Sequence, residues 1–422
     1  MPRPGRNRGP KHHAFRNKLI LNQWLMSLFG IDPLAEKYTG TLRPFHDLAE
    51  RLRKCREGLD ADNLHHFYHV LVDSTLFWDD LAVITKEQVL VYEENIVRHT
   101  RSINERRARP VTWKYFQWLT LLFTEIYLDR FLGNRQGLLE DLNAFVKRFN
   151  QRWTDYADVP PYADDDLNKV CLQNATGSGK TLLMHVNLLQ YRHYARMHGQ
   201  DRVLSRAILL TPNERLSDQH MAEFAESGFW SVQRLDLTRQ GTFDQVDVIE
   251  ITKLGDQEGP NTIATRSLGD QNLLLVDEGH RGMSGKEEGA WFTRRSDLCA
   301  KGFTFEYSAT FEQAVSAANN RGFQNSYARA IIFDYSYRWF YDDGFGKDYQ
   351  ILNLPQSFDD MQAMYLIACL LKFYQQLRLY DDESADLEPF NIEKPLWVFV
   401  GSTVSKARGG SEDEKIMATD VA

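Results

Sequence analysis

The sequence contains few cysteines, and none of them forms a recognisable pair. Four cysteines occur in 422 residues, and no Cys-x-x-Cys motif is present. They are Cys55, Cys171, Cys299 and Cys369. Their wide separation excludes a disulfide framework and a zinc site of the usual ligand spacing. We therefore expect a protein of a reducing compartment.

Long apolar runs are also missing. No stretch reaches the roughly 18 consecutive apolar residues that a membrane-spanning helix requires. The nearest candidate, residues 113–132, is interrupted by Glu125, Asp129 and Arg130. The N-terminus is basic but lacks the apolar core of a signal peptide. These absences predict a soluble, cytoplasmic protein without a membrane partner.

Positive charge is not in excess either. The formal net charge of −8 argues against binding nucleic acid with the whole surface, although it allows binding in a local groove. Hydrophobic residues make up 43% of the chain and aromatic residues 12%, which is enough for a packed core. A length of 422 residues favours two or three domains.

A glycine-rich turn lies between an apolar run and an amphipathic segment. Residues 170–172 form the apolar run, and Leu182, Val186 and Leu189 recur at helical spacing. A phosphate-binding loop requires this strand–loop–helix context. The backbone N–H groups that could converge on a phosphate belong to Thr176, Gly177, Ser178, Gly179 and Lys180.

Two side chains of this loop suit nucleotide chemistry. Lys180 is predicted to reach the β- and γ-phosphates, and the Thr181 hydroxyl to ligate Mg²⁺. Asn174 stands where the full pattern begins with glycine. Because asparagine adopts a positive φ more readily than most residues, we still expect the turn to form. The alternative is a chance Gly-Ser turn before a helix.

The part of the chain before this loop is mostly helical in pattern. We expect a basic flexible arm over residues 1–18, which either touches nucleic acid or is an ordinary solvated tail. Residues 19–157 are predicted to form a helical N-terminal extension, with apolar segments at 19–29, 46–56, 113–131 and 138–149. Within it, His65-His66-x-x-His69 has no acidic partner at ligand spacing, so we interpret these histidines as helix surface.

One glutamine in the helical extension has a second interpretation. Gln117 follows an aromatic residue, Phe116, upstream of the phosphate-binding loop. An aromatic–glutamine pair there could stack on adenine and hydrogen-bond to its edge, which would make Gln117 a nucleotide-binding residue. The alternative is an ordinary helical glutamine.

Strand and helix patterns alternate after a linker rich in proline and acid at residues 158–166. Apolar strands are predicted at 206–213, 247–254, 271–278, 303–308 and 330–333, with an amphipathic helix at 214–224. This alternation indicates an α/β domain with a parallel, doubly wound sheet over residues 158–340. Residues 341–394 read as a connector with a long helix at 361–380. Residues 395–422 read as the start of a second α/β domain whose remainder is missing.

Two adjacent carboxylates follow one of these strands. Asp277 and Glu278 come directly after the apolar run 273–276, so they are expected at the carboxyl edge of the sheet, where open α/β folds bind ligands. Asp277 is predicted to hold Mg²⁺ through its waters. Glu278 is predicted to orient the attacking water and accept its proton. Alone the pair is a weak signal, but beside a phosphate-binding loop it is strong.

These motifs together resemble a known family. Ala175-Thr-Gly-Ser-Gly-Lys-Thr181, Asp277-Glu-Gly-His280 and Ser308-Ala-Thr310 occur in the order and approximate spacing of superfamily 2 helicases of the DExH type. Three motifs together resemble the helicase (Res) subunit of type III restriction enzymes and related bacterial defence proteins. They are Asn174-Ala-Thr-Gly-Ser-Gly-Lys-Thr181, Asp277-Glu-Gly-His-Arg-Gly282, and Tyr335-Ser-Tyr-Arg338 with the Phe-Tyr-Asp-Asp-Gly after it. The superfamily resemblance covers about residues 165–335. It implies a RecA-like fold with ATP and Mg²⁺ as cofactors. DNA as partner is implied only by the resemblance to the type III subunit.

The resemblance also implies roles for residues outside the phosphate-binding loop. His280, Ser308 and Thr310 would couple the state of the bound nucleotide to the affinity for nucleic acid. The residues that would touch the phosphates of one strand are Thr211, Asn213, Thr252 and Lys253. Two alternatives stay open: Ser308-Ala-Thr310 as a simple turn, and Thr211-Pro-Asn213 as a helix N-cap.

Two elements that such enzymes use are missing from the sequence. It has no Gln-x-x-Gly-Arg-x-x-Arg motif to supply an arginine to the γ-phosphate. Glu250-Ile-Thr-Lys253 has the wrong spacing for a nuclease strand. Because an arginine finger contributes on the order of 10³–10⁵ in rate, these residues alone are expected to bind ATP but hydrolyse it slowly.

Three functions remain to be compared. The favoured one is the N-terminal portion of an ATP-dependent DNA translocase or helicase of a type III restriction-like defence enzyme. The second is a nucleotide-gated DNA-binding module without efficient hydrolysis. A small-molecule kinase is disfavoured because Asp277-Glu-Gly-His280 and Ser308-Ala-Thr310 have no purpose there. Duplex DNA bound through its backbone, and a methyltransferase or specificity subunit, are the partners that the resemblance suggests.

Overall fold

The computed structural model divides the chain into two compact units, residues Met1–Lys347 and Asp348–Ala422. The residues that it describes are 15–39, 43–77, 82–153, 159–201, 203–229, 232–238, 242–259, 262–281, 288–318, 320–346, 362–387 and 394–398. The first unit contains the sheet and every predicted site residue. The domain boundaries expected from the sequence remain predictions.

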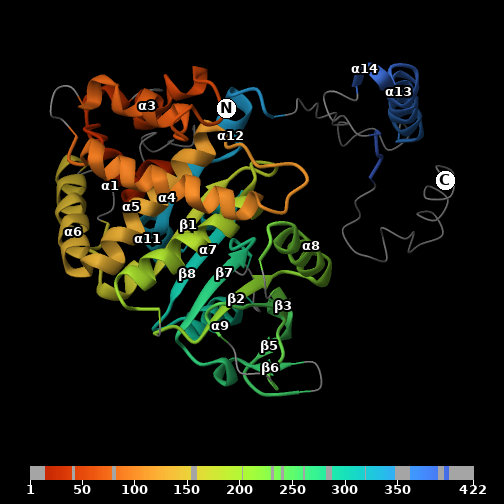
Figure 1. The fold of residues 1–422 in the computed structure, drawn as a ribbon. Helices are drawn as coiled ribbons and strands as arrows, with labels where there is room; N and C mark the ends of the chain where they lie inside the picture. Colours follow the sequence, from red (N-terminus) through yellow and green to blue (C-terminus); the bar gives the residue numbers. More distant parts are fainter. Residues whose placement is uncertain are drawn as a thin grey trace, which may run out of the picture. The chain divides into compact units, whose positions relative to one another are not determined.

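A parallel sheet lies at the centre of the first unit (Figure 1). In the described residues it has seven strands in the order β3-β4-β2-β7-β8-β1-β9, and every pair of neighbours is parallel. The strands are β1 (Lys169–Asn174), β2 (Arg206–Thr211), β3 (Val232–Arg234), β4 (Val246–Glu250), β7 (Asn272–Asp277), β8 (Phe303–Ser308) and β9 (Ile331–Tyr335). A separate two-stranded ladder pairs β5 (Leu254–Gly255) with β6 (Ile263–Ala264). The α/β, RecA-like fold class predicted from the sequence is confirmed.

The central strands are apolar along their whole length because both faces of the sheet are covered. Alternate residues of a strand point to opposite faces. Leu209 of β2 and Leu275 of β7 therefore belong to one core, whereas Ile208 and Leu274 belong to another. Continuous apolar runs are typical of parallel strands buried on both sides.

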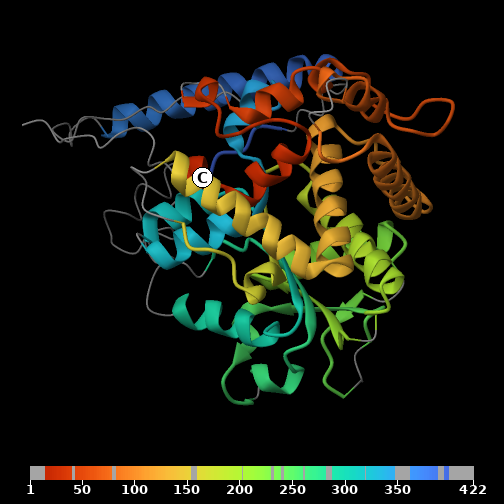
Figure 2. The same cartoon turned by 90° about the vertical axis from the view of Figure 1, so that its left-hand side faces the viewer.

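Helices cover both faces of the sheet (Figure 2). The helices of the first unit are α1 (Ile20–Leu28), α2 (Pro44–Ala49), α3 (His66–Val72), α4 (Lys86–Asn104), α5 (Tyr115–Gly133), α6 (Arg135–Arg152), α7 (Lys180–Met197), α8 (Glu214–Glu226), α9 (Glu288–Leu298), α10 (Phe311–Ala318), α11 (Arg321–Ala330) and α12 (Tyr337–Asp342). The core of one face is shared by the N-terminal helices and α7. Side chains of α9 belong to the core of the other face, and those of α10 and α11 to a third cluster with Cys171 of β1.

A buried polar group joins the N-terminal helices to α7. Asn95 of α4 and Tyr194 of α7 donate hydrogen bonds to the same oxygen of Glu125 on α5, at 3.0 and 2.6 Å. Complete burial raises the pKa of Glu125 to about 7, although these hydrogen bonds act in the opposite direction. The helix that follows the glycine-rich turn is thus fixed to the helix that carries Gln117.

Short 3₁₀ turns complete the first unit. They span Phe15–Lys18, Glu36–Thr39, Leu52–Lys54, Thr75–Phe77, Asp164–Asn168, Ile251–Lys253 and Thr265–Leu268. Phe15 is buried in the first of these turns, which ends at Lys18 within the segment expected as a flexible arm, while residues 1–14 lie outside the described part. The strand expected at 247–254 ends at Glu250 because a 3₁₀ turn replaces its last part.

The second unit is described by itself. It contains α13 (Gln362–Asp382), close to the helix expected at 361–380, and α14 (Ser384–Leu387). Residues 394–398 have no regular secondary structure, and the rest of the strand expected from 394 onward lies outside the described residues. In the described parts of both units, no helix is long and apolar enough to cross a membrane.

Candidate nucleotide-binding site

The glycine-rich turn connects β1 to α7, and its backbone requires glycine. Gly177 and Gly179 have φ angles of 82° and 86°, a conformation in which glycine lacks the steric penalty of other residues. Gly179 is the N-cap of α7, so the positive end of the helix dipole lies at this turn. The Ser178 hydroxyl is buried and forms no hydrogen bond within the described structure. An open helix N-terminus with an unsatisfied buried donor fits a phosphate.

Asn174 does not need the unusual backbone that the sequence suggested. It is the last residue of β1, and the described residues other than glycine with positive φ are Asn63 and Glu278. The turn therefore begins in extended backbone and uses positive φ later, at Gly177 and Gly179. The expected explanation for asparagine at this position is wrong.

Lys180 lies over the turn and close to the predicted catalytic acids. Its ammonium group donates hydrogen bonds of 3.3 Å to the carbonyl oxygens of Asn174 and Ala175. Burial lowers the pKa of Lys180, while the charges of Glu278 and Asp277 oppose this shift. A bound phosphate would offer the ammonium group a stronger, charged partner than these carbonyls.

Gln117 is brought to the same turn from the N-terminal helices. Its amide nitrogen donates a 2.8 Å hydrogen bond to the carbonyl of Ser178, and its amide oxygen accepts one of 2.9 Å from the Lys114 N–H. A Cβ atom at Gly179 would lie only 2.5 Å from the Gln117 nitrogen. Gly179 therefore also leaves room for this glutamine.

The two carboxylates lie at the end of β7. The imidazole Nε2 of His220, on α8, is 3.0 Å from an Asp277 carboxylate oxygen, and the Glu278 N–H donates to the other at 3.0 Å. Burial alone would raise the pKa of Asp277, but His220, this N–H group and Lys180 together hold it below its ordinary value. Asp277 thus remains an anion near the Lys180 ammonium group.

Glu278 adopts an unusual backbone conformation. Its φ of 53° places it in the left-handed region, which is uncommon for residues other than glycine. Its side chain remains 30% exposed and lies 3.2 Å from His280. A partly exposed carboxylate at the mouth of a phosphate site is accessible to water, as a general base must be.

The residues present fit a magnesium ion held together with a nucleotide. Thr181 is half-buried in the first turn of α7, and Asp277 is a charged carboxylate. Among the described residues, no group of three or more His, Cys, Asp or Glu side chains could hold a metal ion alone. Mg²⁺ is usually held by one or two carboxylates, substrate phosphates and waters, so such a group is not needed.

The predicted coupling residues lie together. His280 follows Glu278 in the turn after β7, and its Nδ1 is 2.7 Å from the Ser308 hydroxyl at the end of β8. The same hydroxyl accepts a 3.0 Å hydrogen bond from the Thr310 N–H. The turn that carries the carboxylates is thus connected to the segment that leads into α10.

The predicted nucleic-acid contacts lie near the carboxyl ends of the neighbouring strands β2 and β4, but their side chains differ in exposure. Thr211 is only 1% exposed and its hydroxyl is 2.7 Å from that of Ser217. Asn213 is exposed and caps α8 by accepting a 3.0 Å hydrogen bond from the Leu216 N–H, as the N-cap alternative predicted.

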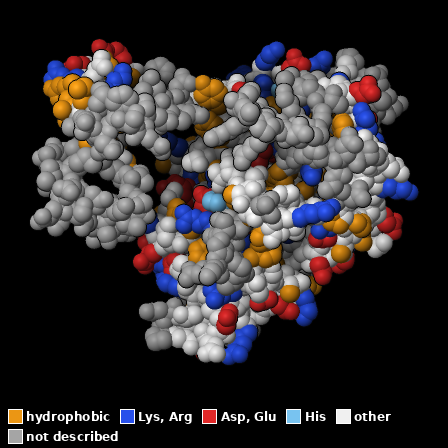
Figure 3. Space-filling model, turned by 180° about the vertical axis from the view of Figure 1, so that it is seen from behind, with side chains coloured by type: hydrophobic (Ala, Val, Ile, Leu, Met, Phe, Trp, Pro, Cys, Tyr) orange, Lys and Arg blue, Asp and Glu red, His pale blue; other side chains and the backbone are white. Residues whose placement is uncertain are grey.

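Thr252 and Lys253 are exposed in the 3₁₀ turn after β4, where Lys253 forms an ion pair with Glu250. On the face of the molecule in Figure 3, positive and negative side chains are interspersed over the described part.

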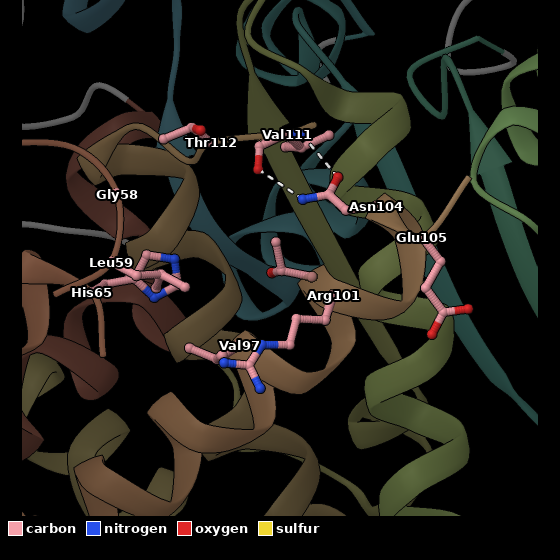
Figure 4. Close-up of a pocket in the computed structure, with 10 residues that line it drawn as sticks. Gly58, Leu59, His65, Val97, Arg101, Asn104, Glu105, Val111 and Thr112 are labelled. Atoms are coloured by element: carbon pink, nitrogen blue, oxygen red, sulfur yellow. Dashed lines mark hydrogen bonds between the residues drawn. The ribbon is translucent and has the colours of Figure 1, made fainter. Parts of the chain in front are cut away.

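A hollow of about 310 Å³ lies apart from this site, in the N-terminal helices (Figure 4). The Asn104 side chain on its wall is already bonded to the backbone N–H and C=O of Val111, at 2.8 and 3.0 Å. His65 is buried and bonds to Glu93 at 2.7 Å, so the expectation that it belongs to a helix surface without an acidic partner is wrong. These polar groups are satisfied by the protein itself.

Comparison with known proteins yields one family. Residues 136–313 match the family described as the type III restriction enzyme, res subunit, and this segment contains the glycine-rich turn, both carboxylates and Ser308-Ala-Thr310. No curated protein and no solved structure gives a significant match.

Proposed function

We propose that this chain binds ATP with Mg²⁺ and couples its hydrolysis to movement on duplex DNA, because residues 136–313 match the family described as the type III restriction enzyme, res subunit. The observation that carries the proposal is that Lys180, the first residue of α7, lies within reach of the charges of Asp277 and Glu278 at the end of β7. A lysine, a metal-binding aspartate and a water-orienting acid are the parts that phosphoryl transfer in this class of ATPase requires.

Each of these residues has a defined task in the proposed mechanism. The turn and Lys180 hold the β- and γ-phosphates, while Thr181 and Asp277 hold Mg²⁺, which when bound neutralises charge on the transferred phosphoryl group. Glu278 orients the water and accepts its proton. His280 lies 3.2 Å from Glu278 and 2.7 Å from Ser308. Through these contacts, a change of the bound nucleotide alters the conformation of the segment that follows β8.

Gln117 is proposed to select adenine. The Gln117 amide nitrogen donates one proton to the Ser178 carbonyl, and the amide oxygen accepts one hydrogen bond from the Lys114 N–H. The side chain therefore retains one free N–H donor and one free oxygen lone pair. Adenine presents the matching N7 acceptor and N6 donor, whereas guanine presents two acceptors. The orientation of the amide therefore favours ATP over GTP.

Replacing Gln117 with alanine is expected to raise the KM for ATP about tenfold and to reduce the preference for ATP over GTP, since an adenine edge left unpaired costs about 1–3 kcal/mol. Steady-state turnover with each nucleotide measures this. Gln136→Ala, at an exposed glutamine that bonds only to Glu140, is the matched control and is expected to change neither value. An unchanged preference in Gln117→Ala would exclude the adenine role.

The proposed DNA dependence is tested by steady-state ATP hydrolysis with and without duplex DNA at two salt concentrations. We expect DNA to increase turnover, and the increase to weaken at the higher salt concentration because contacts to phosphates release counterions. A rate of ATP hydrolysis that is the same with and without DNA at both salt concentrations would contradict the motor function.

We propose as a second function a nucleotide-gated DNA-binding module without efficient hydrolysis. The sequence contains no Gln-x-x-Gly-Arg-x-x-Arg motif to supply an arginine to the γ-phosphate, so we expect these residues to turn over ATP slowly. Nucleotide-dependent DNA binding without measurable turnover would favour the nucleotide-gated binding module. A role in defence against foreign DNA and a methyltransferase or specificity partner are further proposals from the family resemblance. A cytoplasmic location is proposed from the composition of the sequence.

A further inference from the structure

A buried arginine holds the backbone directly after Glu278. Arg295 lies on α9, and its side chain is 4% exposed. Its Nη1 donates a 2.9 Å hydrogen bond to the carbonyl oxygen of Gly279. No local sequence pattern identifies this contact, because the two residues are on separate elements.

The charge of Arg295 is balanced by a buried carboxylate. Glu306, on β8, lies 3.8 Å from Arg295 and accepts a 2.7 Å hydrogen bond from the Tyr327 hydroxyl of α11. Burial alone would lower the pKa of Arg295, but the charge of Glu306 and the neighbouring Tyr327 hold it above its ordinary value. Buried ion pairs are costly to desolvate, and apolar replacements are often equally stable. A contribution to the stability of the fold therefore does not by itself explain why Arg295 and Glu306 are both charged.

The turn that Arg295 contacts is strained at Glu278. A residue other than glycine keeps a φ of 53° only where its surroundings impose it. The Gly279 N–H donates to the Tyr307 carbonyl at 2.9 Å, and the Arg281 N–H donates to the Glu278 carbonyl at 2.9 Å. A Cβ atom at Gly279 would lie 3.0 Å from the Cβ of Glu306, so the backbone approaches β8 as closely as glycine permits.

We propose that Arg295, held by Glu306, is a positioning residue for Glu278. By fixing the carbonyl of the next residue, it keeps Glu278 in the left-handed conformation from which its carboxylate reaches His280 and the phosphate site. This inference rests on the proposed function to the extent that Glu278 is the base of ATP hydrolysis. Arg295 itself does not touch the nucleotide or the reacting water.

The experiment compares the double variant Arg295→Met/Glu306→Leu with the full-length wild-type chain. Removing both charges avoids an unpaired buried ion, so we expect thermal stability to remain near the wild-type value. ATP affinity is expected to change less than about twofold, whereas kcat falls about 10- to 100-fold because a small misplacement of a reacting group has effects of that size. Hydrogen exchange at the amides of Gly279 and Arg281 is expected to accelerate.

Two single variants sharpen the comparison. Arg294→Ala changes the neighbouring arginine, which faces Asp256 at the surface, and is expected to leave kcat and exchange unchanged. Arg295→Lys keeps a charged donor for the Gly279 carbonyl and is expected to recover most of the kcat. A double variant with wild-type kcat and wild-type exchange at Gly279 would overturn the proposal.

The two readouts separate this inference from the proposed function. A wild-type chain that binds but never hydrolyses ATP would contradict ATP hydrolysis by these residues. Hydrogen exchange at Gly279 and Arg281 would then still decide whether Arg295 fixes the turn: faster exchange in the double variant supports it, and unchanged exchange overturns it.

Discussion

Replacing Lys180 with alanine is expected to weaken ATP binding by on the order of 100-fold or more and to abolish measurable hydrolysis. Truncating one partner of a buried, charged hydrogen bond costs about 2–5 kcal/mol, and each 1.4 kcal/mol is a factor of about ten in affinity. Lys180 lies at the glycine-rich turn, where its ammonium group donates hydrogen bonds of 3.3 Å to the carbonyls of Asn174 and Ala175. Titration with a fluorescent ATP analogue measures the loss.

The fold should survive this substitution. Burial lowers the pKa of Lys180 more than the charges of Glu278 and Asp277 raise it, so its charge adds little to the stability of the fold, and thermal unfolding of the variant is expected to resemble that of the wild type. Lys301→Ala removes a surface lysine paired with Asp270 and is expected to bind ATP normally. If Lys180→Ala bound ATP as tightly as Lys301→Ala, the assignment of the glycine-rich turn to phosphate would be wrong.

The sheet and the glycine-rich turn were predictable because their signals are local. The strands are continuous apolar runs. Gly177 and Gly179 adopt a positive φ, and glycine is the residue that the sequence shows at both positions. The strand β3 was missed because it is only three residues long and half-buried. The helix α4 was missed because its buried face includes the polar residues Glu93, Asn95 and His99, which obscure the apolar periodicity.

Contacts between distant elements were not predictable in the same way. The suggestion that Gln117 serves the nucleotide came from its neighbouring aromatic residue, but its bond to Ser178, 61 positions away, depends on how α5 packs against α7. His220 beside Asp277 and Arg295 beside Gly279 lie in segments with no motif. Such residues are set by packing, so only the folded arrangement identifies them.

The neutral substitution Glu278→Gln separates binding from chemistry. Glutamine keeps the size of the side chain and its hydrogen bonds but cannot accept a proton, so we expect kcat to fall about 10²- to 10⁴-fold, the usual contribution of a general base. ATP affinity should remain within a few-fold of the wild-type value, because Lys180 and the turn hold the phosphates. Single-turnover hydrolysis and nucleotide titration measure the two quantities.

A surface substitution provides the control for this prediction. Glu226→Gln alters an exposed glutamate near Arg107 and is expected to hydrolyse ATP at the wild-type rate. In Glu278→Gln, the contact between Glu278 and His280 also loses its charge, while the 2.7 Å contact between His280 and Ser308 remains. If ATP still changes DNA affinity in this variant, the coupling needs ATP binding rather than hydrolysis. Wild-type turnover in Glu278→Gln would place the base elsewhere and remove the reason for the strained backbone at this position.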